Sequence, residues 1–91
     1  MKKLRRDRLK IYGDLLAILD DESSKEKVVL SWVQVRLNVP FDRLKKYLAE
    51  LSNLKLIESE ESLKLTVKGR KFVREYKKVL DFMDDMGVGY Q

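Results

Sequence analysis

Residues 31–51 read SWVQVRLNVPFDRLKKYLAEL and carry the clearest structural pattern in the chain. Apolar residues follow a helical period on both sides of an interruption at Asn38, Val39 and Pro40. Proline restricts the residue before it to extended conformations, and it suits the first turn of a helix that follows. We therefore predict a short helix, a turn of three or four residues, and a second helix over residues 40–53.

The helix predicted over residues 40–53 has an apolar face and a charged face. Its apolar side chains recur at steps of three and four, the spacing of a helix that packs on a core by one side. The apolar face comprises Phe41, Leu44, Tyr47, Leu48 and Leu51. The opposite face comprises Asp42, Arg43, Lys45, Lys46, Ala49 and Glu50. A core this small cannot enclose these charges, so we expect the second face to lie in solvent.

The helix before the turn has two possible beginnings. Residues 31–34 have the S-x-x-Q form of a capping box, which predicts a helix over residues 32–37. A short strand at residues 28–30 would then precede it, because two of these three apolar residues are β-branched. The alternative is one longer helix over residues 24–37, since residues 23–26 have the S-x-x-E form. The sequence leaves both open.

A hairpin and a last helix are predicted after residue 53. Residues 56–59 and 63–66 read as two short strands around the polar turn 60–62. Thr66 is placed to cap a final helix that ends before Gly87. Its apolar stripe consists of Phe72, Val73, Tyr76, Val79, Leu80, Met83 and Met86.

With a first helix over residues 4–21, the predicted order is helix, strand, helix, helix, strand, strand, helix. This is a mostly α-helical fold with a small β-hairpin, the order of a winged helix-turn-helix with a long C-terminal helix. We expect one domain in which residues 1–70 form the winged helix and residues 67–86 form a helix packed on it.

Composition narrows the classes of function. The 91 residues contain no cysteine and no histidine, so a thiol nucleophile, a thiolate metal site and the commonest general base are missing. No glycine-rich phosphate loop is present, and adjacent acids such as Asp20-Asp21 and Asp84-Asp85 are usually solvated. We expect no catalysis, no cofactor and no small-molecule ligand. With neither an export signal nor a membrane span in the sequence, we expect a cytoplasmic, nucleoid-associated protein.

Charge favours a polyanionic partner. Lys and Arg number 20 against 15 Asp and Glu, a formal net charge of +5. In a helix-turn-helix the second helix enters the major groove of DNA, where arginine pairs bidentately with guanine. We predict that Arg43 contacts a base and that Lys45 and Lys46 contact phosphates or bases. Further phosphate partners are predicted at Lys2, Lys3, Arg5 and Arg6, and beside the hairpin at Lys64 and Lys68.

The hairpin tip does not fit a DNA contact, because Glu58, Glu60 and Glu61 cluster there and would repel phosphates. We therefore do not expect it to enter the minor groove. If these acids cancelled the positive charge of helix 40–53, we would instead interpret the chain as a protein-interaction module. Such a module would bind its partner through Trp32 or through the apolar stripe of the C-terminal helix.

Several motifs resemble those of a known family. They are residues 31–41, the Tyr47-Leu48 pair, Leu56-Ile57, and the string at residues 65–69, which reads LTVKG. In this order the chain resembles the small winged-helix DNA-binding proteins of archaea and their viruses, which include transcription regulators and a chromosomal architectural protein. Abundant Lys and Glu with few Asn and Gln are also typical of hyperthermophile proteins.

The resemblance implies a homodimer in which the last helices pair as an antiparallel coiled coil. The predicted interface is Tyr76, Val79, Leu80, Met83 and Met86, joined in the family pattern by Phe72. The chain departs from the pattern at Pro40, where serine is usual, and at Lys55, where glycine is usual. Either Lys55 or Asn53 must then adopt the left-handed conformation, at a cost of about 1 kcal/mol. The implied function is a dimeric, sequence-specific transcription regulator, with a non-specific architectural protein as the alternative.

Overall fold

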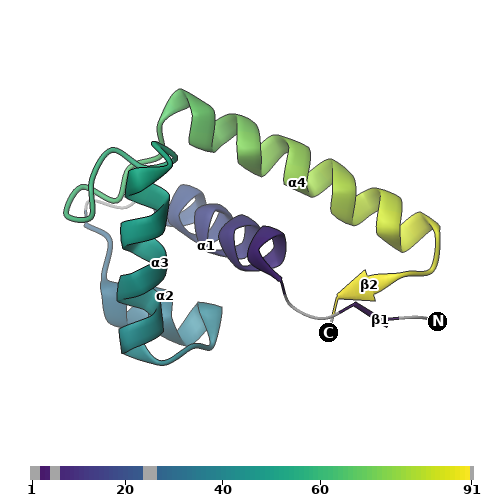
Figure 1. Ribbon diagram of the computed structural model, residues 1–91, viewed down its shortest axis with the longest axis horizontal. Coiled ribbons are helices and arrows are strands. Elements are labelled where there is room, and N and C mark those ends of the chain that lie inside the picture. Colours follow the sequence, from purple (N-terminus) through teal and green to yellow (C-terminus); the bar gives the residue numbers. More distant parts are fainter. Residues whose placement is uncertain (1–2, 5–6, 24–26, 91) are drawn as a thin grey trace.

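The computed structural model describes residues 3–4, 7–23 and 27–90, which are mostly α-helical (Figure 1). The helices of this part are α1 (Arg8–Glu22), α2 (Leu30–Leu37), α3 (Phe41–Asn53) and α4 (Val67–Asp85). Two short strands, β1 (Lys3–Leu4) and β2 (Gly89–Tyr90), pair in parallel. None of these helices combines the length and the apolar composition needed to cross a bilayer.

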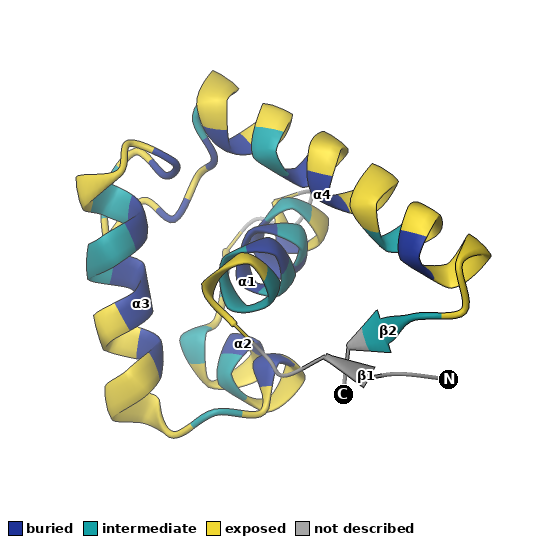
Figure 2. Cartoon of the chain, turned by 45° about the vertical axis from the view of Figure 1, so that its right-hand side comes forward, coloured by how far each residue is buried: buried dark blue, intermediate teal, exposed yellow. Residues whose placement is uncertain are grey.

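Helix α1 lies at the centre, and the other helices turn their buried residues toward it (Figure 2). The core contains Leu15, Leu16, Leu19, Val33, Leu37, Leu44, Leu48, Leu51, Ile57 and Val73. The apolar face predicted for α3 is confirmed at its four positions from Leu44 to Leu51. The prediction was wrong at Phe41, which is 46% exposed. Phe41 is the first residue of α3, and the buried residues of this helix begin at Leu44.

Both predicted beginnings of α2 were wrong. The helix starts at Leu30, and its N-cap, Val29, makes no side-chain hydrogen bond. The carbonyl of Val29 accepts from the amides of Trp32 and Val33 at 3.1 and 3.2 Å, so helical bonding begins before Ser31 can act as a cap. Leu30 and Val28 are both partly buried against the core, and their packing outweighs the local capping signal.

The predicted strand at residues 28–30 and the predicted two-stranded hairpin are not formed. Between α3 and α4 the chain makes one antiparallel bridge, Ile57 to Leu65, beside a hydrogen bond from the Glu58 amide to the Lys64 carbonyl at 2.8 Å. Leu63 has a φ of 60° and a buried side chain, so its backbone leaves the extended region that a strand requires. Without a strand beside it, the segment at residues 28–30 has no ladder to join.

Helix α4 begins as predicted. The Thr66 hydroxyl accepts from the Gly69 amide at 3.0 Å, which satisfies one of the unpaired donors of the first turn. The helix then crosses α1, where Tyr76 packs on Gly13 and its hydroxyl donates to Asp14 Oδ1 at 2.9 Å. It ends before Gly87, whose φ is 73°, and the chain turns back into β2. The pairing of β1 with β2 was not predicted.

Candidate nucleic-acid interface

A tight turn joins α2 to α3. Asn38 closes α2 in the left-handed conformation with a φ of 60°, and its amide donates to the Gln34 carbonyl at 2.9 Å. Asparagine tolerates this conformation better than most residues. Pro40 follows with φ −61° and ψ 151°, extended backbone that leads directly into Phe41. The predicted break at Asn38 to Pro40 is confirmed.

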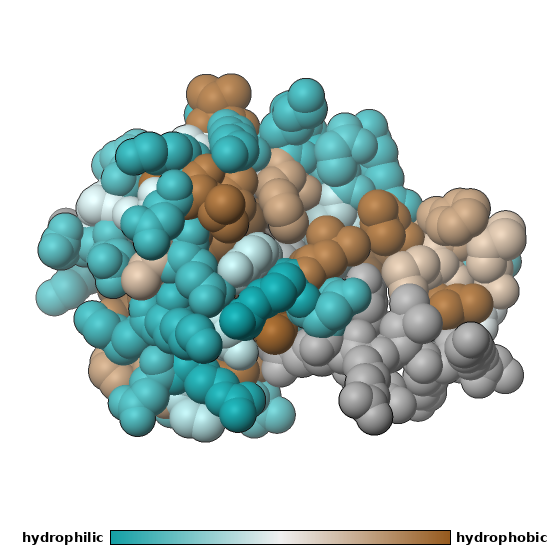
Figure 3. Space-filling view, in the orientation of Figure 1, coloured by the Kyte–Doolittle hydropathy of each residue, from teal (hydrophilic) through white to brown (hydrophobic). Residues whose placement is uncertain are grey.

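The basic face of α3, which we define as Arg43, Lys45 and Lys46, is exposed. Since successive residues of a helix turn by about 100°, Arg43 and Lys46 lie side by side and Lys45 lies further round the helix. Leu44 and Leu48 occupy the buried side. Figure 3 shows a mainly hydrophilic surface where Figure 1 draws α3, so the charges face solvent on the outside of the molecule.

Sequence reasoning missed a cluster that ties the start of α1 to α3, which we call the Arg8 cluster: Arg8, Tyr12, Tyr47 and Glu50. The Arg8 guanidinium lies over both tyrosine rings, 5.1 Å from the centroid of Tyr47 and 5.9 Å from that of Tyr12. Its Nη2 is 3.5 Å from Glu50 Oε2. Tyr12 and Arg8 are 38 and 42 residues from Glu50 in sequence, and no local sequence pattern predicts contacts over such separations.

Tyr12 holds the Glu50 carboxylate in place. Its hydroxyl donates to Glu50 Oε1 at 2.7 Å. Burial, followed by this hydrogen bond, raises the pKa of Tyr12 above its usual value. The hydroxyl therefore keeps its proton at neutral pH and remains a donor to Glu50.

The acidic turn, Glu58, Glu60 and Glu61, lies at the end of α3 remote from Phe41 (Figure 1). Two of its acids, Glu58 and Glu61, line a cavity of about 410 Å³ together with Lys27, Lys64 and Arg70, and this cavity also borders the end of α1. Glu58 and Glu61 therefore share this cavity with three cations. They are separated from the basic face of α3, which occupies the first turns of that helix.

A comparison with protein families gives one match to this architecture. The winged helix-turn-helix family matches residues 5–84, which is nearly the whole chain. The chain belongs to the winged helix-turn-helix family. Comparison with curated proteins and with solved structures returned no match. Membership indicates DNA binding, and the predicted helix-turn-helix is present in the structure as α2, the turn and α3.

The other residues predicted to contact DNA lie on the segment between α3 and α4, at the start of α4 and at the N-terminus. Lys64 is exposed on the segment between α3 and α4. Lys68 is also exposed, but its Nζ donates to the Leu54 carbonyl at 2.8 Å and thereby caps the end of α3. Of the N-terminal residues, only the backbone of Lys3 is described, in β1, whereas Lys2, Arg5 and Arg6 lie outside the described residues.

The predicted dimer residues divide into buried and exposed sets. Tyr76 and Met83 are buried within their own chain, Leu80 is partly buried, and Val79 and Met86 are exposed. Phe82, which the prediction omitted, is 63% exposed on the same helix. Figure 3 shows apolar side chains extending along the region where Figure 1 draws α4.

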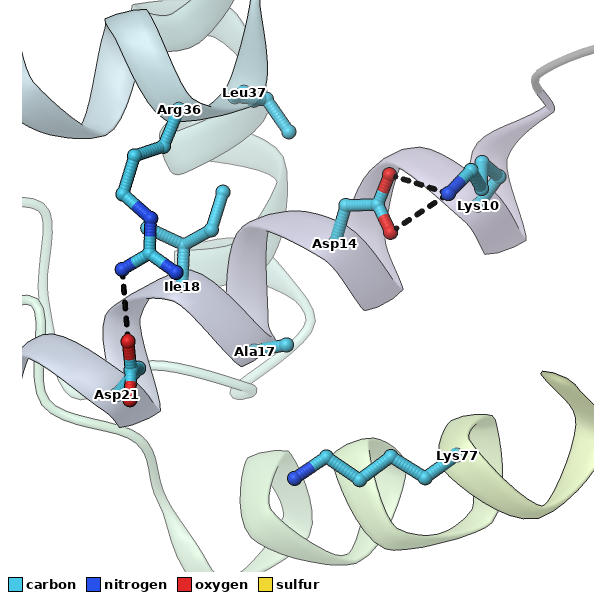
Figure 4. A pocket seen from close by; sticks show the side chains of 8 residues that line it. All are labelled: Lys10, Asp14, Ala17, Ile18, Asp21, Arg36, Leu37 and Lys77. Atoms are coloured by element: carbon cyan, nitrogen blue, oxygen red, sulfur yellow. Dashed lines mark hydrogen bonds and ion pairs between the residues drawn. The ribbon is translucent and has the colours of Figure 1, made fainter. Parts of the chain in front are cut away.

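Two ion pairs lie in a groove beside α1. It measures about 630 Å³ and is lined by residues of α1, α2 and α4 (Figure 4). Lys10 Nζ lies 2.9 Å from Asp14 Oδ2, and Arg36 Nη1 lies 2.9 Å from Asp21 Oδ2. Hydrogen bonds to Asp21 and then Glu22 raise the pKa of Arg36. Across residues 3–4, 7–23 and 27–90, no group of three acidic side chains is placed to hold a metal ion.

Proposed function

We propose that this winged helix-turn-helix protein binds double-stranded DNA as a homodimer and acts as a sequence-specific transcription regulator by binding and not by catalysis. In this proposal α3 enters the major groove and Arg43 contacts a base. Lys45 and Lys46 contact neighbouring phosphates or bases. Such a role implies association with the nucleoid in the cytoplasm.

One observation carries the DNA proposal. Arg43, Lys45 and Lys46 are exposed on the first turns of a helix that follows a tight turn and is anchored on its other side by Leu44, Leu48 and Leu51. A rigid helix with cations on its outer side fits the width and the charge of the major groove. The position of the acidic turn at the far end of α3 supports the proposal, because the acids do not border these cations.

The dimer proposal rests on the exposed apolar stripe of α4. Val79, Phe82 and Met86 are spaced by three and four residues, so they lie along one side of the helix. Phe82 is 63% and Met86 60% exposed, and large exposed apolar side chains aligned on one side of a helix are suited to contact with a partner. A second copy offers the same stripe, and a two-fold arrangement would present two copies of α3 to half-sites about one helical turn apart.

Fluorescence anisotropy tests DNA binding and distinguishes a regulator from an architectural protein. Wild type is titrated against a random-sequence duplex and against duplexes selected for binding, each at two salt concentrations. Preference for the selected duplexes, lost in Arg43→Ala with Lys46→Ala, supports the regulator. Equal affinity for both pools points to an architectural role, and absence of binding at low salt refutes the proposal.

Sedimentation tests the dimer. Phe82→Glu introduces a charge into the stripe and is expected to give monomers at concentrations where wild type is dimeric. Val67→Glu is the matched control, because Val67 is also exposed on α4 but lies at the first residue of the helix. A monomeric wild type, or a Phe82→Glu variant that remains dimeric, contradicts this interface.

Trp32 supports a second candidate, a protein-interaction module. Its side chain is 51% exposed on α2, with Val29 and Val35 also exposed nearby in sequence. Tryptophan is among the residues most enriched at binding hot spots. This candidate is preferred if wild type binds no duplex while its α2 surface binds a protein partner.

A further inference from the structure

We propose that Arg8 forms a second phosphate-binding site, separate from the basic face of α3, which takes a phosphodiester of the DNA backbone flanking the major groove. The inference rests on the proposed DNA binding. It extends the DNA-contacting surface from α3 onto the start of α1 and assigns Tyr12, Tyr47 and Glu50 as positioning residues.

Two rings and one carboxylate determine where the Arg8 guanidinium lies. It is 5.1 Å from the centroid of Tyr47 and 5.9 Å from that of Tyr12, within the range of a cation–π contact. Glu50 approaches from one side at 3.5 Å, a distance too long for a tight bidentate pair. The guanidinium is therefore oriented without being fully neutralised, and its planar set of donors suits a phosphate.

The Arg8 side chain also remains accessible. It is 50% exposed, whereas that of Glu50 is 27% exposed. The Tyr12 hydroxyl, which donates to Glu50 Oε1 at 2.7 Å, occupies the other carboxylate oxygen. An incoming phosphate thus meets the open side of the guanidinium, while the acid stays bound to Tyr12.

The Arg8 cluster borders the basic face of α3. Tyr47 lies one helical turn after Arg43, and Glu50 lies one turn after Lys46, so each pair shares a side of the helix. Arg8 contacts both Tyr47 and Glu50, so it lies beside the part of α3 that follows Arg43 and Lys46. Cations of two helices thereby form one surface along which a DNA strand can run.

Salt-dependent DNA binding tests this site with a matched pair of variants. Arg8→Gln removes the charge of the site, and Arg74→Gln removes the same charge from an exposed position on α4. Both variants lower the net charge by one, so a difference between them reports the local contact. We expect Arg8→Gln to bind about tenfold more weakly, the size of a lost charge-assisted hydrogen bond. The slope of log affinity against log salt should also decrease by about one, and Arg74→Gln should retain the wild-type slope.

The outcomes separate the two claims. If wild type binds no DNA, the proposed function fails. If wild type binds and Arg8→Gln matches Arg74→Gln in affinity and slope, the Arg8 site fails while DNA binding stands. Thermal unfolding of each variant shows whether it is folded at the assay temperature. If Arg8→Gln does not fold, Arg8→Lys replaces it. We expect Arg8→Lys to bind DNA more weakly than wild type with the same salt slope. An unchanged affinity would refute the role of the two tyrosine rings in orienting the guanidinium.

Discussion

Gly13→Ala is expected to destabilise the fold, although alanine is normally the better residue inside a helix. Gly13 lies in α1, where α4 crosses it. A Cβ added there would lie 2.5 Å from three atoms of the Tyr76 ring. Comfortable carbon contacts lie at about 3.5 Å or more, so the ring would have to move by roughly 1 Å. Tyr76 is 2% exposed and its hydroxyl is bonded to Asp14, so the ring has little room to move.

The magnitude follows from three contributions. Replacing a helical glycine by alanine gains about 1 kcal/mol. Overpacking at a buried site costs about 1 to 3 kcal/mol, and weakening the hydrogen bond from Tyr76 to Asp14 costs about 1 kcal/mol. The net loss is then about 2 kcal/mol, which corresponds to roughly 8 to 16 °C in the melting temperature of a domain of this size.

Thermal unfolding followed by circular dichroism measures this loss, with Gly89→Ala as the control because its added Cβ meets no atom within 4 Å. The double variant isolates the cause. In a Tyr76→Leu background, Gly13→Ala should become neutral or stabilising, because the ring that it strikes is gone. An unchanged or raised melting temperature for the single variant would refute the packing of α4 on α1 described above.

Three further variants probe backbone strain, a partly buried ion pair and a tyrosine with a raised pKa. Lys55→Gly should stabilise the protein by about 1 kcal/mol, since Lys55 has a φ of 62°, and chemical denaturation measures the gain. Arg36→Ala should lower the melting temperature by several degrees, more so than Arg74→Ala, because Arg36 Nη1 lies 2.9 Å from the buried carboxylate of Glu22. Tyr12 has a raised pKa in the folded state, so its contribution to stability is complete below the usual value of 10.0 and is lost as the pH rises through the folded value. Tyr12→Phe should remove that part of the alkaline loss, and equal alkaline curves would contradict the bond to Glu50.

Several features set by local chemistry were predicted correctly, although the capping signal at Ser31 was not borne out. The break at Asn38 to Pro40, the cap at Thr66 and the buried face of α3 each depend on residues within one or two turns of one another. Of the two residues predicted to take the left-handed conformation in place of the missing glycine, Lys55 and Asn53, it is Lys55 that does so. Such features could be predicted because proline geometry, hydroxyl capping and helical period act within a short stretch of chain.

Features that depend on distant partners could not be predicted. Alternation within residues 56–66 favoured two strands, but a strand needs a partner, and the buried side chain of Leu63 at positive φ limits the pairing to one bridge. The Arg8 cluster joins two helices whose contacting residues are far apart in sequence. Helical period placed Tyr76 on an apolar stripe but did not distinguish packing on Gly13 from contact with a second copy.

An amide-resolved NMR titration with duplex DNA tests whether the chain binds DNA through α3. We expect salt-sensitive shifts concentrated on residues 41–46 and on the start of α1 around Arg8. The acidic turn and the solvent side of α4 near Arg74 should change little. Shifts centred on α2 near Trp32 with α3 unaffected would contradict binding through α3, as would the absence of shifts at low salt.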